Sequence, residues 1–213
     1  MLDFAKASEG LKKIYKGEIF ELISALLAIV AILAMAGTTV AALGESMGGT
    51  IAGASLTLVI IVAALVLSIC SFILILIGLN KVGKENKWCK IAFILIFVDI
   101  VLQIVLSLVG KGNFVSFVSS LCNAIVMILI IQGCMDLNKK KNNLEMVEKG
   151  KKVLYVIIIA NAISIISSFI ITIATPLTTV LAGIGALVSV VGLICAYVKF
   201  LKYLKMTAAT LID

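Results

Sequence analysis

The chain has 213 residues with a mean hydropathy of +1.25, and 62% of its residues are apolar. Soluble domains are roughly 45–50% apolar, so the composition indicates a membrane protein and excludes a large soluble catalytic domain. The net charge of +7 comes from lysines, with no arginine and no histidine in the chain. Because the lysines lie at the ends of apolar runs, we expect them to contact anionic lipid headgroups and not nucleic acid.

Six apolar runs follow one another, and each is long enough to cross roughly 30 Å of hydrocarbon, which takes about 20 helical residues. The runs cover approximately residues 19–43, 51–79, 88–109, 114–135, 153–175 and 177–204. We therefore predict an all-α integral membrane protein with a six-helix domain over residues 19–205. An amphipathic arm (1–18) precedes this domain and a short tail (206–213) follows it, and neither is long enough to form a core of its own.

The first run has one feature of a cleaved signal peptide, since Ala34, Met35 and Ala36 have the small-x-small form of a cleavage site. Apolar character continues beyond this point to Leu43, and the arm before the run contains acidic residues. We therefore expect the run to be a retained membrane span.

The longest polar interruption is the charged segment LNKKKNNLEMVEKGKK, residues 137–152. We expect a loop here. Leu144 and Val147 would lie on one side of a short surface helix within it, and a solvated linker is the alternative.

The lysines are distributed unevenly between the two ends of the predicted spans. If the arm, the segments around 81–90 and 137–152 and the last three lysines of the chain (Lys199, Lys202 and Lys205) share one side, every lysine except Lys111 lies on that side. Positive residues are retained in the cytoplasm, so we expect both termini to be cytoplasmic. Lysine without arginine and abundant isoleucine favour an AT-rich bacterial source, so the expected location is a bacterial inner (plasma) membrane.

An internal repeat is visible in the lysine spacing. Lysine pairs three residues apart precede the first, third and fifth runs, as Lys13/Lys16, Lys87/Lys90 and Lys149/Lys152. A shared Leu-Asn-Lys sequence closes the second and fourth runs, at 79–81 and 137–139. We therefore predict three helical hairpins of one topology. The retention of positive charge in the cytoplasm could produce the same pattern without a repeat.

Asp99 is an acidic residue near the middle of an apolar run, eleven residues from Trp88 and eleven from Gly110. Gln103 and Ser107 follow it on the same helix face, at i+4 and i+8. A charged aspartate at the bilayer centre costs roughly 2.5–3.5 kcal/mol on insertion scales. We therefore expect Asp99 to face the protein interior, either protonated or paired with a bound cation.

Two asparagines lie at a depth similar to that of Asp99. Asn123 is near the middle of the next run, and Asn161 takes the place of Asp99 when the third and fifth runs are aligned on their lysines. One hypothesis is a proton or small-cation site formed by Asp99, Gln103, Asn123 and Asn161. The alternative, which we favour, is hydrogen bonding between helices by a neutral acid, an interaction that averages about 0.6 kcal/mol. Transporters usually carry more polar and helix-breaking residues at mid-depth.

Small residues predict close helix packing on the last two runs, at i+4 spacing on the fifth run and as a stripe on the sixth. The packing residues are Ala160, Ser164 and Ser168 on the fifth run and Gly185, Ser189 and Gly192 on the sixth. We expect these contacts within one chain, and a homo-oligomer is the alternative.

The sequence predicts no catalytic residues. It contains no HExxH motif, no GxSxG elbow, no paired intramembrane aspartates and no phosphate-binding loop. The five cysteines form no CxxC pair, so we expect no metal site and no cofactor. One buried carboxylate without a basic partner is a poor acid–base pair, so we do not expect an enzyme.

Two functions remain for a chain of this kind. The first is a structural or accessory component that binds another membrane protein, which agrees with its nearly uniform hydrophobicity. The second is a small transporter or channel in which Asp99 binds a proton or a cation. The variant Asp99→Asn distinguishes them, because asparagine keeps the hydrogen bonding of a neutral acid but cannot release a proton.

Overall fold

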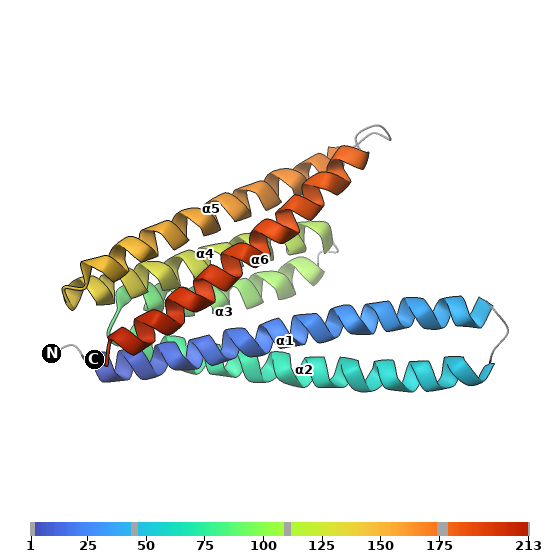
Figure 1. Ribbon diagram of the computed structural model, residues 1–213, viewed down its shortest axis with the longest axis horizontal. Helices are drawn as coiled ribbons and strands as arrows, with labels where there is room; N and C mark the ends of the chain where they lie inside the picture. The colour runs from blue at the N-terminus through green and yellow to red at the C-terminus, as the bar shows by residue number, and fades with distance from the viewer. Residues whose placement is uncertain (1–2, 44–46, 109–111, 174–178, 213) are drawn as a thin grey trace. The chain divides into compact units, whose positions relative to one another are not determined.

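The computed structural model describes the backbone of residues 3–43, 47–108, 112–173 and 179–212. It describes side chains for residues 3–35, 57–108, 118–164, 166 and 188–212. The described residues form six helices: α1 (Phe4–Leu43), α2 (Met47–Gly83), α3 (Lys87–Leu108), α4 (Gly112–Lys140), α5 (Leu144–Ile173) and α6 (Thr179–Thr210) (Figure 1). The all-helical fold is therefore confirmed for this part of the chain.

Four helical stretches within the described residues are long and apolar enough to cross a membrane. They are Phe4–Met35, Thr57–Gly83, Lys87–Leu108 and Val118–Lys140. Large apolar side chains in these stretches are exposed, with Leu33 at 66%, Leu58 at 63% and Val101 at 59%. Apolar surface of this extent is unfavourable in water at about 25 cal/mol per Å², so these stretches suit a lipid environment.

Aspartate or asparagine begins each odd-numbered helix. Asp3 Oδ1 accepts the backbone N–H of Lys6 at 3.0 Å at the start of α1, and Asn143 Oδ1 accepts the N–H of Met146 at 3.1 Å at the start of α5. Asn86 occupies the same position before α3. Each side chain pairs an N–H group that the first helical turn leaves without a partner, so these residues fix where the helices begin.

Only residues 141–143 separate α4 from α5, so the predicted loop over 137–152 is wrong. Asn142 has a φ of 59°, and the N–H of Asn143 donates to the carbonyl of Asn138 at 2.9 Å. This is a Schellman ending, in which an asparagine adopts the left-handed conformation that closes a helix. The charged residues on either side remain helical, because lysines in the last turn interact favourably with the helix dipole.

Helix α1 continues without a break from Phe4 to Leu43, so residues 4–18 of the expected arm are helical and joined to the first apolar run. Its 40 residues measure about 60 Å, roughly twice the thickness of the hydrocarbon. Gly10 lies inside this helix, where an added Cβ would collide with Val82 and the carbonyl oxygen of Gly78. The glycine therefore permits a close approach between α1 and α2.

The chain forms two units by its internal contacts: residues 13–77, and residues 1–12 together with 78–213. In the larger unit α3 packs against α4, α4 against α5, and α5 against α6. The hydroxyl of Ser8 donates to the carbonyl of Ala208, which joins the first turns of α1 to the end of α6. The described beginning and end of the chain therefore lie together (Figure 1).

The tightly packed core of the larger unit lies at the end where the chain begins and finishes. Its fully buried apolar side chains include Leu11, Leu79, Val82, Cys89, Ile130, Ile131, Cys134, Leu137, Phe200 and Leu204. We call this part of the larger unit, residues 3–12, 78–92, 130–150 and 200–212, the lysine-rich end. It contains the two short turns that connect α2 to α3 and α4 to α5.

Candidate functional site

Asp99 lies on the buried face of α3, with 8% of its surface exposed. Nε2 of Gln103 donates to Asp99 Oδ2 at 2.7 Å and to Ser119 Oγ at 3.1 Å. The thiol of Cys122 also lies against the Asp99 carboxyl group. Because Ser119 and Cys122 belong to α4, this polar cluster connects α3 to α4 inside a predicted membrane span.

The second carboxyl oxygen of Asp99, Oδ1, is buried and has no hydrogen-bond partner among the described residues. Burying an unpaired polar atom is costly, and burying an unpaired charge is more costly still. The described surroundings offer Asp99 amide, hydroxyl and thiol groups. Oδ1 is therefore the carboxyl oxygen of this cluster that accepts no hydrogen bond from a described residue.

The structure brings Gln103 to Asp99, and it places the two predicted asparagines elsewhere. Asn123 is exposed on α4. Asn161 is half-buried on α5, and its Nδ2 donates to the carbonyl of Ile157 in its own helix at 2.9 Å. The four residues expected to form one cluster therefore do not meet.

Ser119 and Cys122 are the site residues that the sequence analysis missed. They lie four residues and one residue before Asn123, at a similar depth, but they face α3 where Asn123 does not. The buried residues Cys122 and Val126 mark this face of α4 at i+4 spacing. This spacing could indicate which face of α4 packs against α3. The run is so uniformly apolar, however, that the indication in the sequence is weak.

A comparable polar contact occurs between α1 and α2 in the smaller unit. Ser24 Oγ donates to the carbonyl of Ala64 at 2.8 Å and lies 2.7 Å from Ser68 Oγ. Ser24 follows Lys16 by eight residues and Asp99 follows Lys90 by nine, so both occur at a similar distance from the entering lysine. In each case the polar group bonds to the next helix.

The predicted packing residues of the fifth and sixth runs fall into three groups. Ala160 and Ser189 are buried and Ser164 is half-buried. Ser168 and Gly185 lie outside the described side chains. At Gly192, an added Cβ would meet no described heavy atom within 4 Å, so the structure shows no close approach there.

Gly150 is a site of close helix packing that the sequence analysis did not identify. It lies on α5 in the lysine-rich end, where an added Cβ would collide with the hydroxyl of Tyr203 on α6 and the side chain of Met135 on α4. The three helices therefore approach one another closely at Gly150, because a residue without a side chain permits it.

A polar network holds the turn between α2 and α3 against α4. Nδ2 of Asn86 donates to Asp136 Oδ2 at 2.8 Å and to the carbonyl of Gly133 at 3.3 Å, while its Oδ1 accepts the N–H of Trp88 at 2.9 Å. Asp136 also pairs with Lys140 at 2.8 Å. One buried amide thus caps α3 and bonds to α4 at the same time.

Asn138, near the end of α4, forms a similar polar network with the end of α6. It is fully buried, and its Nδ2 donates to the carbonyl of Cys134 at 2.9 Å and to Thr207 Oγ1 at 3.4 Å. Thr210 Oγ1 donates to Asn138 Oδ1 at 3.4 Å. The last turns of α6 therefore cover the Leu-Asn-Lys sequence that ends α4.

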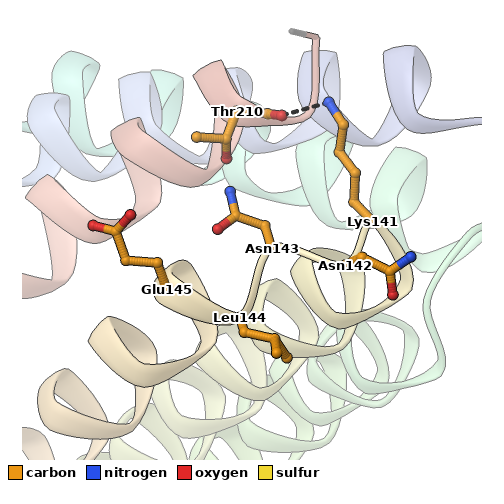
Figure 2. A pocket seen from close by; sticks show the side chains of 6 residues that line it. All are labelled: Lys141, Asn142, Asn143, Leu144, Glu145 and Thr210. Carbon is orange, nitrogen blue, oxygen red and sulfur yellow. Dashed lines mark hydrogen bonds between the residues drawn. The ribbon is translucent and has the colours of Figure 1, made fainter.

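A shallow pocket lies beside the turn between α4 and α5 (Figure 2). Its lining residues are Lys141, Asn142, Asn143, Leu144, Glu145 and Thr210. Nζ of Lys141 donates to the carbonyl of Thr210 at 2.6 Å, so the ammonium group is engaged within the protein. Glu145 pairs with Lys149 at 2.6 Å, and this ion pair lowers the pKa of the Glu145 carboxyl below its ordinary value. The two charged groups that line the pocket therefore already have partners within the protein.

Within the described residues, no group of three or more histidine, cysteine, aspartate or glutamate side chains could hold a metal ion. Cys89 and Cys134 are both fully buried, in the apolar core of the lysine-rich end.

No protein-family model, curated protein or solved structure matches this chain.

Proposed function

We propose that this chain is a multipass membrane protein that acts as a structural or accessory component and binds another membrane protein. It crosses a bacterial inner membrane six times as three antiparallel hairpins, with the lysine-rich end and both termini in the cytoplasm. The lysine distribution supports this orientation, since positive residues are retained on the cytoplasmic side. The Asx caps that begin α1, α3 and α5 support a repeated unit that starts on that side.

The observation that carries the accessory function is the contrast between the two parts of the helices. Among the side chains that the structure describes, the fully buried ones lie mainly in the lysine-rich end, whereas the apolar stretches expose large side chains such as Leu33, Leu58 and Val101. A protein built this way offers long helix faces to neighbours within the bilayer. Few polar groups line the described parts of these faces, so they suit packing against another helix better than passage of a hydrophilic substrate.

Photo-crosslinking in the native membrane tests the accessory function. A photoreactive residue at exposed Val101 is expected to crosslink to one defined membrane protein, and the same residue at fully buried Ala92 is not. Leu33 and Leu58 provide two further exposed positions. Crosslinking to lipid alone from all three exposed positions would contradict the proposal.

The second candidate function is transport of a proton or small cation through Asp99. The buried, unpartnered Oδ1 is the observation that favours it, because this atom is free to carry a proton or to bind a cation. Intramembrane carboxyl groups with this freedom occur in proton relays. On this hypothesis Gln103 holds the other carboxyl oxygen and positions the group between α3 and α4.

Flux of protons and sodium into proteoliposomes under an imposed gradient separates the two functions. The accessory function predicts no flux from the wild type or from Asp99→Asn. Transport predicts flux that the asparagine variant loses. Asp99→Leu removes the acceptor of Gln103 as well, so we expect it to lower the free energy of unfolding by about 0.6–1.7 kcal/mol, while Asp99→Asn stays close to wild type. Equal stability of both variants would remove the structural role of Asp99.

A further inference from the structure

A groove of about 310 Å³ lies within the larger unit, between the end of α2 and the first turns of α3. Its lining residues are Leu79, Asn80, Gly83, Lys84, Lys90, Phe93 and Ile94. The groove is therefore apolar at its base and carries two ammonium groups, and none of its lining residues is acidic. An added Cβ at Gly83 would press against the backbone of Lys90, so the glycine is what lets the two helix ends meet at the base of the groove.

The two lysines of this groove are free to bind a ligand. Lys84 and Lys90 are exposed and make no ion pair with any described residue. The nearest acidic residue in sequence, Glu85, accepts the backbone N–H of Asp3 at 3.0 Å through Oε2. Their positive charge is therefore not neutralised within the described chain, in contrast to Lys141 in the pocket of Figure 2, which bonds to Thr210.

The corresponding turn at the end of α4 shows why this groove is open. Asn80 and Asn138 occupy the same position in the two Leu-Asn-Lys sequences. Asn138 is fully buried beneath Thr207 and Thr210 of α6, whereas Asn80 is exposed and lines the groove. At the end of α2, by contrast, no described helix covers Asn80 in the way that α6 covers Asn138.

An apolar stripe continues from the groove along α3 into the predicted span. Phe93 and Ile94 follow Lys90 by one helical turn, and Phe97 follows Phe93 by another, with the two rings 5.1 Å apart in an edge-to-face arrangement. Ile94 and Phe97 are exposed. Trp88 and Lys87 lie just before the stripe, with the Lys87 ammonium 5.2 Å from the Trp88 ring. Tryptophan and lysine together are typical of the membrane–water interface.

We propose that this groove binds one anionic phospholipid, with the phosphate between Lys84 and Lys90 and an acyl chain along Phe93, Ile94 and Phe97. The charge and the shape both favour this occupant: two unpaired ammonium groups lie above an exposed apolar stripe that leads toward the bilayer centre. Anionic lipid would thereby fill the gap at the α2–α3 turn and join the two helix ends. The inference depends on membrane insertion and not on the accessory or transport function proposed above.

Trp88 gives a direct test, because it is the single tryptophan of the chain and lies between the two groove lysines in sequence. The full-length protein is reconstituted in phosphatidylcholine vesicles that contain increasing fractions of brominated phosphatidylglycerol or brominated phosphatidylcholine. Bromine quenches tryptophan fluorescence at short range, so the quenching measures which lipid occupies the neighbourhood of Trp88. We expect at least about a fivefold preference for phosphatidylglycerol, the effect of about one lysine near an anionic surface.

The matched variants distinguish a defined site from general attraction to the lysine-rich end. Lys84→Gln/Lys90→Gln is expected to lose the preference. Lys151→Gln/Lys152→Gln, which removes the same charge from exposed positions on α5, is expected to keep it. Both variants alter exposed side chains and are compared by circular dichroism before reconstitution. Equal quenching of the wild type by the two lipids, or an equal loss in both variants, would overturn the proposal.

A final arm separates a lipid from a soluble anion. Inorganic phosphate is added to the wild type in phosphatidylglycerol vesicles at constant ionic strength. The lipid proposal predicts unchanged quenching. Displacement of the brominated lipid from Trp88 by millimolar phosphate would assign the groove to a soluble phosphate compound instead and would overturn the lipid assignment.

Discussion

Asn86 performs two tasks with one side chain, and they can be separated by substitution. Its Oδ1 caps α3, and its Nδ2 donates to Asp136 and to the carbonyl of Gly133. Aspartate is as good an N-cap as asparagine, so capping alone predicts that Asn86→Asp is neutral. The buried network predicts otherwise, because the new carboxylate would face Asp136 and leave the Gly133 carbonyl unpaired.

We therefore expect Asn86→Asp to lower the free energy of unfolding by about 2–4 kcal/mol, the sum of an unpaired buried group and a repelled charge. The matched control is Asn143→Asp, which changes the half-buried cap of α5, where the described contact is to the N–H of Met146 alone. The control is expected to be within about 0.5 kcal/mol of wild type. Thermal unfolding in detergent micelles measures both, and equal stability of the two variants would refute the role of the network.

The surroundings of Asp99 are only partly predictable from the sequence. The depth of a residue follows from counting along an apolar run, so the sequence predicts Asp99 and its partner Gln103. The rotation of α4 about its axis does not follow from depth, because nearly every residue of that run is apolar. The polarity of Asn123 predicts that it is the partner of Asp99 on α4, yet Ser119 and Cys122 are the α4 residues that lie toward Asp99.

At the scale of whole helices, Gly150 and Gly192 have opposite surroundings. Gly150 is enclosed by Tyr203 and Met135, whereas Gly192 faces open space among the described residues. We expect Gly150→Ala to destabilise the protein by about 1–3 kcal/mol, because the added methyl group forces α4, α5 and α6 apart. Gly192→Ala is expected to be neutral or to stabilise by up to about 1 kcal/mol, since alanine favours the helix. Thermal unfolding of the two variants checks this, and greater harm from Gly192→Ala would place the close packing at the membrane centre instead.

The helix boundaries show a second limit of the sequence analysis. The apolar runs predict the helices well, because a bilayer requires spanning helices of a certain length and composition. The ends of the helices are harder to predict from the sequence. A dense run of charges is typical of a loop, and it predicts a loop over residues 137–152. In the structure, Asn142 closes α4 and Asn143 caps α5, so the charged residues on either side of them belong to the ends of these two helices.

At the scale of the molecule, the packed core lies in the lysine-rich end and the apolar stretches expose their side chains. Hydropathy predicts the membrane and the lysine distribution predicts the orientation, but neither predicts which helices pack together. The contacts among α3, α4, α5 and α6 depend on details such as Gly133 and Gly150, which a count of apolar residues does not capture.

The orientation of the six predicted crossings decides on which side of the membrane the lysine-rich end and both termini lie. Cysteine labelling with a membrane-impermeant maleimide tests it most directly in intact cells. Glu148→Cys places a thiol on the exposed surface of α5 near the α4–α5 turn, and Lys111→Cys places one between the third and fourth runs. We expect labelling of Lys111→Cys in intact cells, with Glu148→Cys labelled only after permeabilisation. Labelling of Glu148→Cys in intact cells would refute the cytoplasmic location of the lysine-rich end.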